Sequence, residues 1–195
     1  MNITQNRGTV IDRAIVRFGE SQTLPKFQIR ENSTKLYIPQ GGKDYAIATS
    51  NGQGEMPLNF RAKENGTYTI TVNPENVEMA YLHLIDNMTG ADVDLLQTPN
   101  YSFNANVTDY ESRFKLVFAV GPSTGSGTFA FISNGNWIIN NEGEATLQVI
   151  DVNGRILSSE TINGCVSKSI NATSGVYMLR LINGDNVKVQ KIVVR

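Results

Sequence analysis

Short segments in which apolar and polar side chains alternate one by one recur along the chain. Clear examples are Leu58–Lys63, Thr67–Val72, Arg113–Phe118 and Val176–Leu181. Successive side chains of a β-strand point to opposite faces, so this pattern places one face of each strand on a core and the other nearer the solvent. The stretch nearest to helical spacing, Val107–Phe114, is expected to be a loop or a single turn. The pattern therefore predicts an all-β, antiparallel protein.

Asn-Gly pairs punctuate these segments. They occur at Asn51-Gly52, Asn65-Gly66, Asn153-Gly154, Asn163-Gly164 and Asn183-Gly184. Both residue types tolerate the positive φ angles of two-residue hairpins. The pairs near the end of the chain predict a tight meander of strands at about 145–152, 155–162, 165–171, 175–183 and 186–194. Its core is expected to consist of Leu147, Val149, Ile156, Ile170, Tyr177, Leu179, Leu181 and Val193.

The segment 121–128 is rich in glycine and serine and reads as a linker. It predicts two β-sandwich domains in tandem, of the immunoglobulin-like or jelly-roll-like kind, at residues 1–120 and 129–195. A weak similarity links the two: Leu82–Asp86 is followed by a turn with Gly90, and Leu147–Asp151 by a turn with Gly154. Related sandwiches would explain this, and so would the general likeness of β-hairpins.

Composition excludes several classes of function. The formal net charge of −1 leaves no basic surplus for neutralising phosphates, so we expect no nucleic-acid binding. No apolar run approaches the ~20 residues of a membrane-spanning helix, so no membrane span is expected. The glycines of 121–128 are not followed by the Lys-Ser/Thr of a phosphate-binding loop. Because residues 1–7 do not resemble a signal peptide, we expect either a cytoplasmic protein or the C-terminal piece of a longer exported one.

Few residues could carry chemistry. His83 is the single histidine and Cys165 the single cysteine, and neither has an evident partner for general-base or nucleophilic catalysis. We therefore expect no enzyme activity and no cofactor. The carboxylates Asp86, Asp92 and Asp94 could contribute to a calcium site, but their spacing lacks the glycine and closing glutamate of a known calcium loop. No metal site is predicted.

Aromatic residues leave one binding hypothesis open. Trp137, Tyr37, Tyr45 and Tyr101 could form a platform on which sugars stack, although aromatics of small sandwiches more often belong to the core. Glu142 and Glu144 are expected in a solvated turn.

Three stretches near the C-terminus resemble a known family. They are Leu147–Leu157, Ser174–Leu181 and Val189–Arg195. In order and spacing they are similar to the C-terminal sorting domain of the type IX secretion system of Bacteroidetes, with a strand, an Asp-x-x-Gly-Arg hairpin, a Gly-x-Tyr strand and a final lysine-bearing strand. Where that family commonly opens with Pro-Asn-Pro, this chain has Ile132–Trp137. Residues 89–96 and 109–116 resemble, more weakly, the β-sandwich modules that precede such domains in surface proteins.

The resemblance implies a non-catalytic C-terminal region that directs or anchors a larger exported protein at the cell surface, with residues 1–120 as a spacer. Its motif residues here are Gly154, Arg155, Gly175, Tyr177 and Lys191. The implied partners are the type IX secretion machinery and upstream domains of the same parent protein. The implied location is secreted or on the outer membrane after export across the periplasm. The alternative is an adhesin module at residues 1–120 that binds a surface glycan or a protein.

Overall fold

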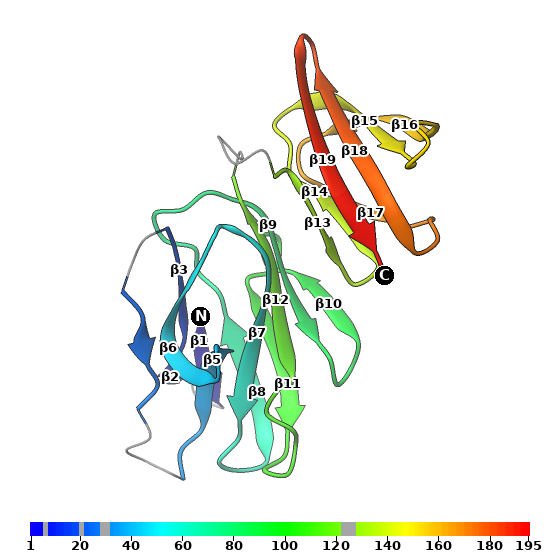
Figure 1. The fold of residues 1–195 in the computed structure, drawn as a ribbon. Coiled ribbons are helices and arrows are strands. Elements are labelled where there is room, and N and C mark those ends of the chain that lie inside the picture. Colours follow the sequence, from blue (N-terminus) through cyan, green and yellow to red (C-terminus); the bar gives the residue numbers. More distant parts are fainter. Residues whose placement is uncertain (6–7, 20–21, 28–31, 122–127) are drawn as a thin grey trace. The chain divides into compact units, whose positions relative to one another are not determined.

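The protein is all-β, as predicted. A computed structural model describes residues 1–5, 8–19, 22–27, 32–121 and 128–195; these contain nineteen strands and no helix. There is accordingly no helix among them that is long and apolar enough to span a membrane. The described residues form two compact units, Met1–Phe118 and Ala119–Arg195 (Figure 1).

The first unit contains two sheets. A four-stranded sheet has the order β11 (Asn100–Ala105), β8 (Gly66–Thr71), β1 (Asn2–Gln5) and β2 (Thr9–Arg13). An eight-stranded sheet has the order β10 (Ala91–Asp94), β9 (Met79–Asp86), β12 (Phe114–Val120), β7 (Gln53–Arg61), β5 (Lys35–Gln40), β6 (Lys43–Ser50) and β3 (Ile15–Phe18), with β4 (Leu24–Pro25) paired to β6. Strands β3 and β6 run parallel, which the predicted antiparallel pattern did not include.

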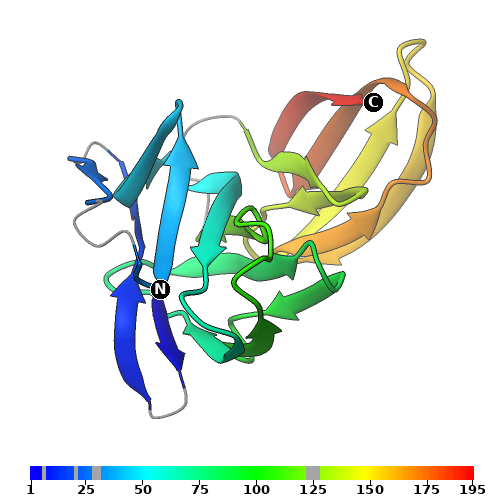
Figure 2. The ribbon, with the colours of Figure 1, turned by 90° about the horizontal axis from the view of Figure 1, so that it is seen from below.

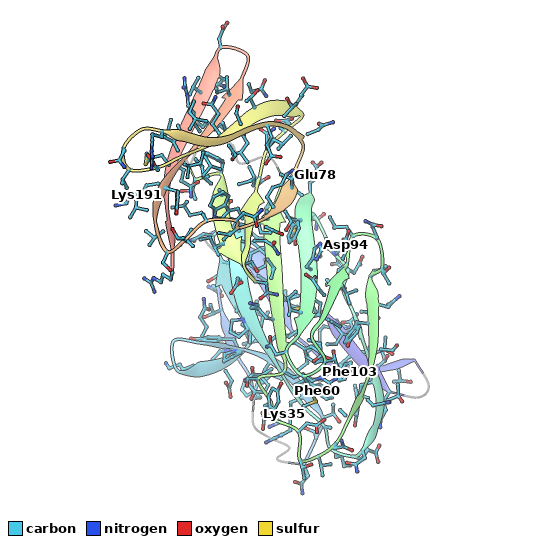
Figure 3. All side chains as sticks on the ribbon, turned by 90° about the vertical axis from the view of Figure 1, so that its right-hand side faces the viewer. Lys35, Phe60, Glu78, Asp94, Phe103 and Lys191 are labelled. Carbon is cyan, nitrogen blue, oxygen red and sulfur yellow. The ribbon has the colours of Figure 1, made fainter. Side chains whose placement is uncertain are left out.

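The alternating segments of the first unit face the core as predicted. The apolar side chains of Leu58–Lys63 and Thr67–Val72 are buried, while their polar neighbours are at least partly accessible. Aromatic rings join the two sheets: Phe60 packs edge-on against Phe103 of the facing sheet at 5.1 Å between ring centroids (Figure 3). Edge-to-face contacts of this kind add to the stabilisation that burial provides.

Strand β12 departs from the expected alternation. Arg113 and Val117, predicted on its solvent side, are buried together with Phe114 and Phe118, and Ala119 is buried as well. The strand lies between β9 and β7 inside the eight-stranded sheet, so its backbone is paired on both edges. Arg113 is therefore part of the interior and needs a charged partner there.

The second unit is a smaller sandwich. One sheet has the order β13 (Ala130–Ser133), β14 (Asn136–Ile139) and β17 (Val166–Ser169). The other has the order β16 (Ile156–Asn163), β15 (Glu144–Ile150), β18 (Gly175–Asn183) and β19 (Asn186–Val194). Strands β18 and β19, orange and red, lie side by side in Figures 1 and 2. The expected simple meander is wrong, because β17 joins β14 and β15 pairs with β18.

Two residues predicted for the core of this unit are exposed. Ile156 and Val193 face solvent, whereas Leu147, Val149, Tyr177, Leu179 and Leu181 are buried as predicted and Ile170 is partly buried. The register pairs Tyr177 with Ile192 and Gly175 with Val194, which puts Ile192 and Val194 on the inner face and Val193 on the outer one. Ile156 follows an irregularity in the β15–β16 pairing, on an edge strand.

The two-residue Asn-Gly hairpin with both φ angles positive lies elsewhere than predicted. It is Asn134-Gly135, with φ values of 46° and 71°, between β13 and β14. Positive φ at both positions is the type I′ geometry. This turn occupies the segment where the resembled family commonly has Pro-Asn-Pro. Of the predicted linker, residues 122–127 lie outside the described residues.

Candidate functional site at one end of the C-terminal sheet

The hairpin between β15 and β16 is organised by Asp151. Its Oδ1 accepts the backbone N–H of Asn153 at 2.9 Å and that of Arg155 at 3.0 Å, and its Oδ2 accepts Arg155 Nε at 2.7 Å. These bonds, the Arg155 N–H first among them, lower the pKa of Asp151 although its limited burial opposes the shift. Gly154 has a φ of 80°, which a side chain would disfavour. The Arg155 side chain remains 74% exposed, so the turn presents to solvent a positively charged side chain that is bonded to Asp151.

Tyr177 anchors the start of β18. Its ring packs against Trp137 at 6.2 Å between centroids, and its hydroxyl donates to the backbone carbonyl of Thr173 at 2.8 Å. This return bond to the chain four residues upstream resembles the tyrosine corner of immunoglobulin-like sandwiches. A Cβ added at Gly175 would meet the Tyr177 ring at 3.6 Å, an ordinary contact, so space does not require glycine at that position.

The last strand presents two adjacent residues in opposite directions. Lys191 is exposed and lies at the outside of the ribbon in Figure 3. Gln190 points inward: its Oε1 accepts the N–H groups of Phe129 and Ala130 at 2.7 and 2.9 Å, and its Nε2 donates to the Ala130 carbonyl at 2.6 Å. Gln190 thus ties the end of the chain to the beginning of this unit. Sequence reasoning missed it, because β19 also contains Asn186, Lys188 and Lys191, and nothing in this pattern shows that Gln190 has a partner 60 positions away.

Cross-strand register brings the motif residues together. Ile150 pairs with Met178, and Met178 with Lys191, so these three form one row across the outer face of the sheet. The turn of Asp151–Arg155 follows Ile150 directly, and Tyr177 precedes Met178. Gly154, Arg155, Gly175, Tyr177 and Lys191 therefore lie towards one end of the four-stranded sheet, called here the motif end. Two of them, Arg155 and Lys191, present cations to solvent there.

The candidate residues of the first unit do not converge. His83 Nδ1 lies 2.6 Å from Asp92 Oδ1, and its ring stacks on Tyr81 at 4.1 Å between centroids. Asp94 accepts the N–H of Leu96 at 2.9 Å and Gln97 Nε2 at 2.8 Å. In the described part of the chain no three His, Cys, Asp or Glu side chains gather as metal ligands would.

Asp86, the third carboxylate considered for calcium, belongs to a buried ion pair. It accepts Arg113 Nε at 3.0 Å and Arg113 Nη2 at 2.8 Å, as well as the Tyr101 hydroxyl at 2.9 Å. Burial by itself would raise the pKa of Asp86, but the bonds from Arg113, Met88 N–H and Tyr101 outweigh it and lower the pKa. Both oxygens of the Asp86 carboxylate therefore bind Arg113.

The aromatic residues considered for a sugar platform form no common surface. Trp137 and Tyr37 are buried, Tyr45 packs against the core of the first unit, and Tyr101 is held by Asp86. The Tyr37 hydroxyl donates to Glu111; burial, followed by this bond, raises its pKa to about 12. These contacts favour the core interpretation.

Two further features of the described residues are the cysteine Cys165 and a cleft in the first unit. Burial raises the pKa of the Cys165 thiol to about 11, which keeps it protonated at neutral pH. Within the first unit a cleft of about 610 Å³ has apolar lining that includes Phe18, Leu82 and Phe118, and charged residues Arg13, Arg17 and Glu75.

Comparison with known proteins identifies one segment. Residues 133–195 match the family model described as the secretion system C-terminal sorting domain. Neither the curated proteins nor the solved structures contain a significant match to the chain. The matched residues begin at Ser133, at the end of β13, and include the whole motif end.

Proposed function

Residues 133–195 are a type IX secretion C-terminal sorting domain, and from this premise we propose that the chain is the non-catalytic C-terminal region of a larger exported protein. Proteins with this domain are exported to the cell surface or secreted, which confirms the localisation predicted from the sequence. The partner of the second unit is the secretion machinery of a Bacteroidetes cell. The parent protein's own activity resides in upstream domains.

The observation that carries the proposal is the gathering of the motif residues at one end of a folded sheet. Gly154 and Tyr177 shape that end: the first permits the turn and the second holds the start of β18 to Thr173. Arg155 and Lys191 are exposed and are the residues that contact the machinery. Recognition of this kind needs a fixed surface rather than a catalytic pocket.

A reporter fused before residue 1 of the chain tests the proposal in a host with a working type IX system. The full chain should deliver the reporter to the surface or the medium. A matched fusion that ends at Phe118, the last residue of the first compact unit, should leave it in the periplasm. Retention of both fusions, or export of both, would contradict a sorting role for residues 119–195.

For the first unit we propose a spacer between the sorting domain and the parent protein. The competing role, a binding module, is favoured by the cleft near Arg13 and Arg17 and by the partly exposed stack of Tyr81 on His83. Incubation of the 195-residue chain with a glycan array and with the host's surface proteins decides between the two. Binding that Arg13→Glu or Tyr81→Ala abolishes would replace the spacer by the binding module.

A further inference from the structure

Among the described residues no strand pairs with the outer edge of β19, although the Gln190 side chain on its inner face bonds the backbone of β13. In the part of the chain that the structure describes, β19 (Asn186–Val194) ends its sheet and pairs with β18 alone. At nine residues it is a long edge. An unpaired edge presents a row of N–H and C=O groups that can hydrogen-bond to another strand, and native proteins usually shield it.

The hairpin geometry shows which residues face this edge. Asn183 pairs with Asn186 across the two residues Gly184 and Asp185. In a two-residue hairpin this closing pair is hydrogen-bonded, and hydrogen-bonded and non-hydrogen-bonded pairs then alternate along the ladder. The backbone groups of Val187, Val189, Lys191 and Val193 therefore point away from β18, toward the open edge.

The side chains of the same residues lie on the outer face. Val187, Val189 and Val193 are 45%, 51% and 49% exposed. Three valines with half their surface in water, along a single strand, are an unusual use of apolar residues unless another surface covers them. β-Branched side chains also favour the extended conformation that strand pairing requires.

Charge restricts what can pair there. From β18 to the last residue, the basic residues are Arg180, Lys188, Lys191 and Arg195, and the acidic one is Asp185. The whole chain, by contrast, has a net charge of −1. None of the four forms an ion pair within the described residues. A second copy of β19 would bring like charges together, whereas a strand with a carboxylate opposite Lys191 would be attracted.

We propose that the open edge of β19 accepts an extended, acidic strand of a protein partner by β-augmentation. Main-chain hydrogen bonds supply the affinity in this mode, and the valines and Lys191 supply the selectivity. The inference rests on the proposed sorting function, which places the partner strand in the secretion machinery. It assigns to the final strand a role beyond folding: β19 is the surface to which the partner adds.

Val189→Pro in the reporter fusion to the full chain tests the pairing. Proline removes an N–H that faces the open edge and leaves the ladder to β18 intact, a placement that edge strands tolerate. Val189→Thr keeps the N–H and the branched shape. We expect the proline variant to be exported at least about tenfold less than the threonine variant, as the loss of a hydrogen bond at a buried pairing implies. Equal export of the two variants overturns the proposal.

Two controls make the result decisive. Thermal unfolding of the purified proline variant, followed by Trp137 fluorescence, should stay cooperative near the wild-type midpoint. If it does not, Lys191→Glu and Lys191→Arg take its place. The charge reversal should abolish export, whereas the arginine variant should be exported. Equal export of the two variants would overturn the proposal that the partner strand is acidic. Failure of the wild-type fusion itself to be exported is a different outcome, which removes the sorting function and with it this inference.

Discussion

Each unit contains a turn in which an aspartate at the end of a strand binds an arginine, but the two turns lie in different surroundings. Asp86 accepts the N–H two residues on, at 3.0 Å, and Asp151 does the same at 2.9 Å. The Asp86–Arg113 pair is buried, with side-chain exposures of 1% and 2%; Asp151 and Arg155 are 12% and 74% exposed. The first arginine thus stabilises the interior, and the second is exposed to solvent.

A tyrosine in each unit allows the same comparison between a larger and a smaller core. Tyr68 donates to the Glu64 carbonyl and Tyr177 to the Thr173 carbonyl, both at 2.8 Å and both four residues upstream. Tyr68 belongs to an aromatic cluster with Phe60 and Phe103, whereas Tyr177 has Trp137 as its aromatic neighbour. The smaller unit therefore depends more heavily on its tyrosine, since it has less core to compensate for a loss.

The largest expected effect follows from this dependence. Tyr177→Ala should cost about 3–5 kcal/mol, as large-to-small substitutions of buried aromatics do. That is comparable with the whole stability of a domain of ~70 residues. The second unit should be unfolded while the first keeps its amide protection. Simultaneous loss of protection in both would show that they form one cooperative unit.

Arg113→Met should be nearly as damaging, in the other unit. Removing one partner of a buried ion pair leaves an uncompensated charge and costs about 3–5 kcal/mol. Amide exchange of the first unit measures this loss. The fluorescence of Trp137, the single tryptophan, reports the second unit and should be unchanged. The double variant Asp86→Leu/Arg113→Met should recover much of the stability, and a loss below ~1 kcal/mol in the single variant would contradict a stabilising pair.

Lowering the pH should affect the stability of the two units to different extents, and this effect should be smaller than those of the substitutions above. Asp86 and Asp151 both have a lowered pKa in the folded protein, so the stability each contributes is present above the unfolded value of ~4 and is lost as pH falls through the folded pKa. Asp86→Asn should flatten the acid slope of the first unit between pH 5 and 3. Asp151→Asn should change the slope of the second unit far less, because the exposed pair is screened by solvent. A steeper change for Asp151→Asn would reverse the comparison.

Sequence patterns predicted the strands better than their surroundings. In Thr67–Val72 the apolar residues occupy a single phase, and the predicted inner face is correct. The last strand has valines or isoleucine on both faces, so only the pairing of Tyr177 with Ile192 decides that Val193 points outward. Strand periodicity alone cannot resolve such a segment.

Partners distant in the chain were also beyond sequence reasoning. The alternation within Arg113–Phe118 places Arg113 on the solvent side, yet Asp86 neutralises it in the interior from 27 positions away. Gln190 bonds Ala130 across 60 positions. The Asp151–Arg155 turn could be anticipated because its partners lie within five consecutive residues, where local geometry determines the contact.

Export and stability of Arg155→Ala, measured side by side, test the account most directly. An exposed ion pair contributes only about 0–1 kcal/mol, so the Trp137 unfolding transition of the variant should remain close to that of the wild type. Export of the fused reporter should nevertheless fall sharply, because the cation displayed at the motif end is lost. Wild-type export from a variant that is equally stable would contradict the claim that this turn is exposed in order to be recognised.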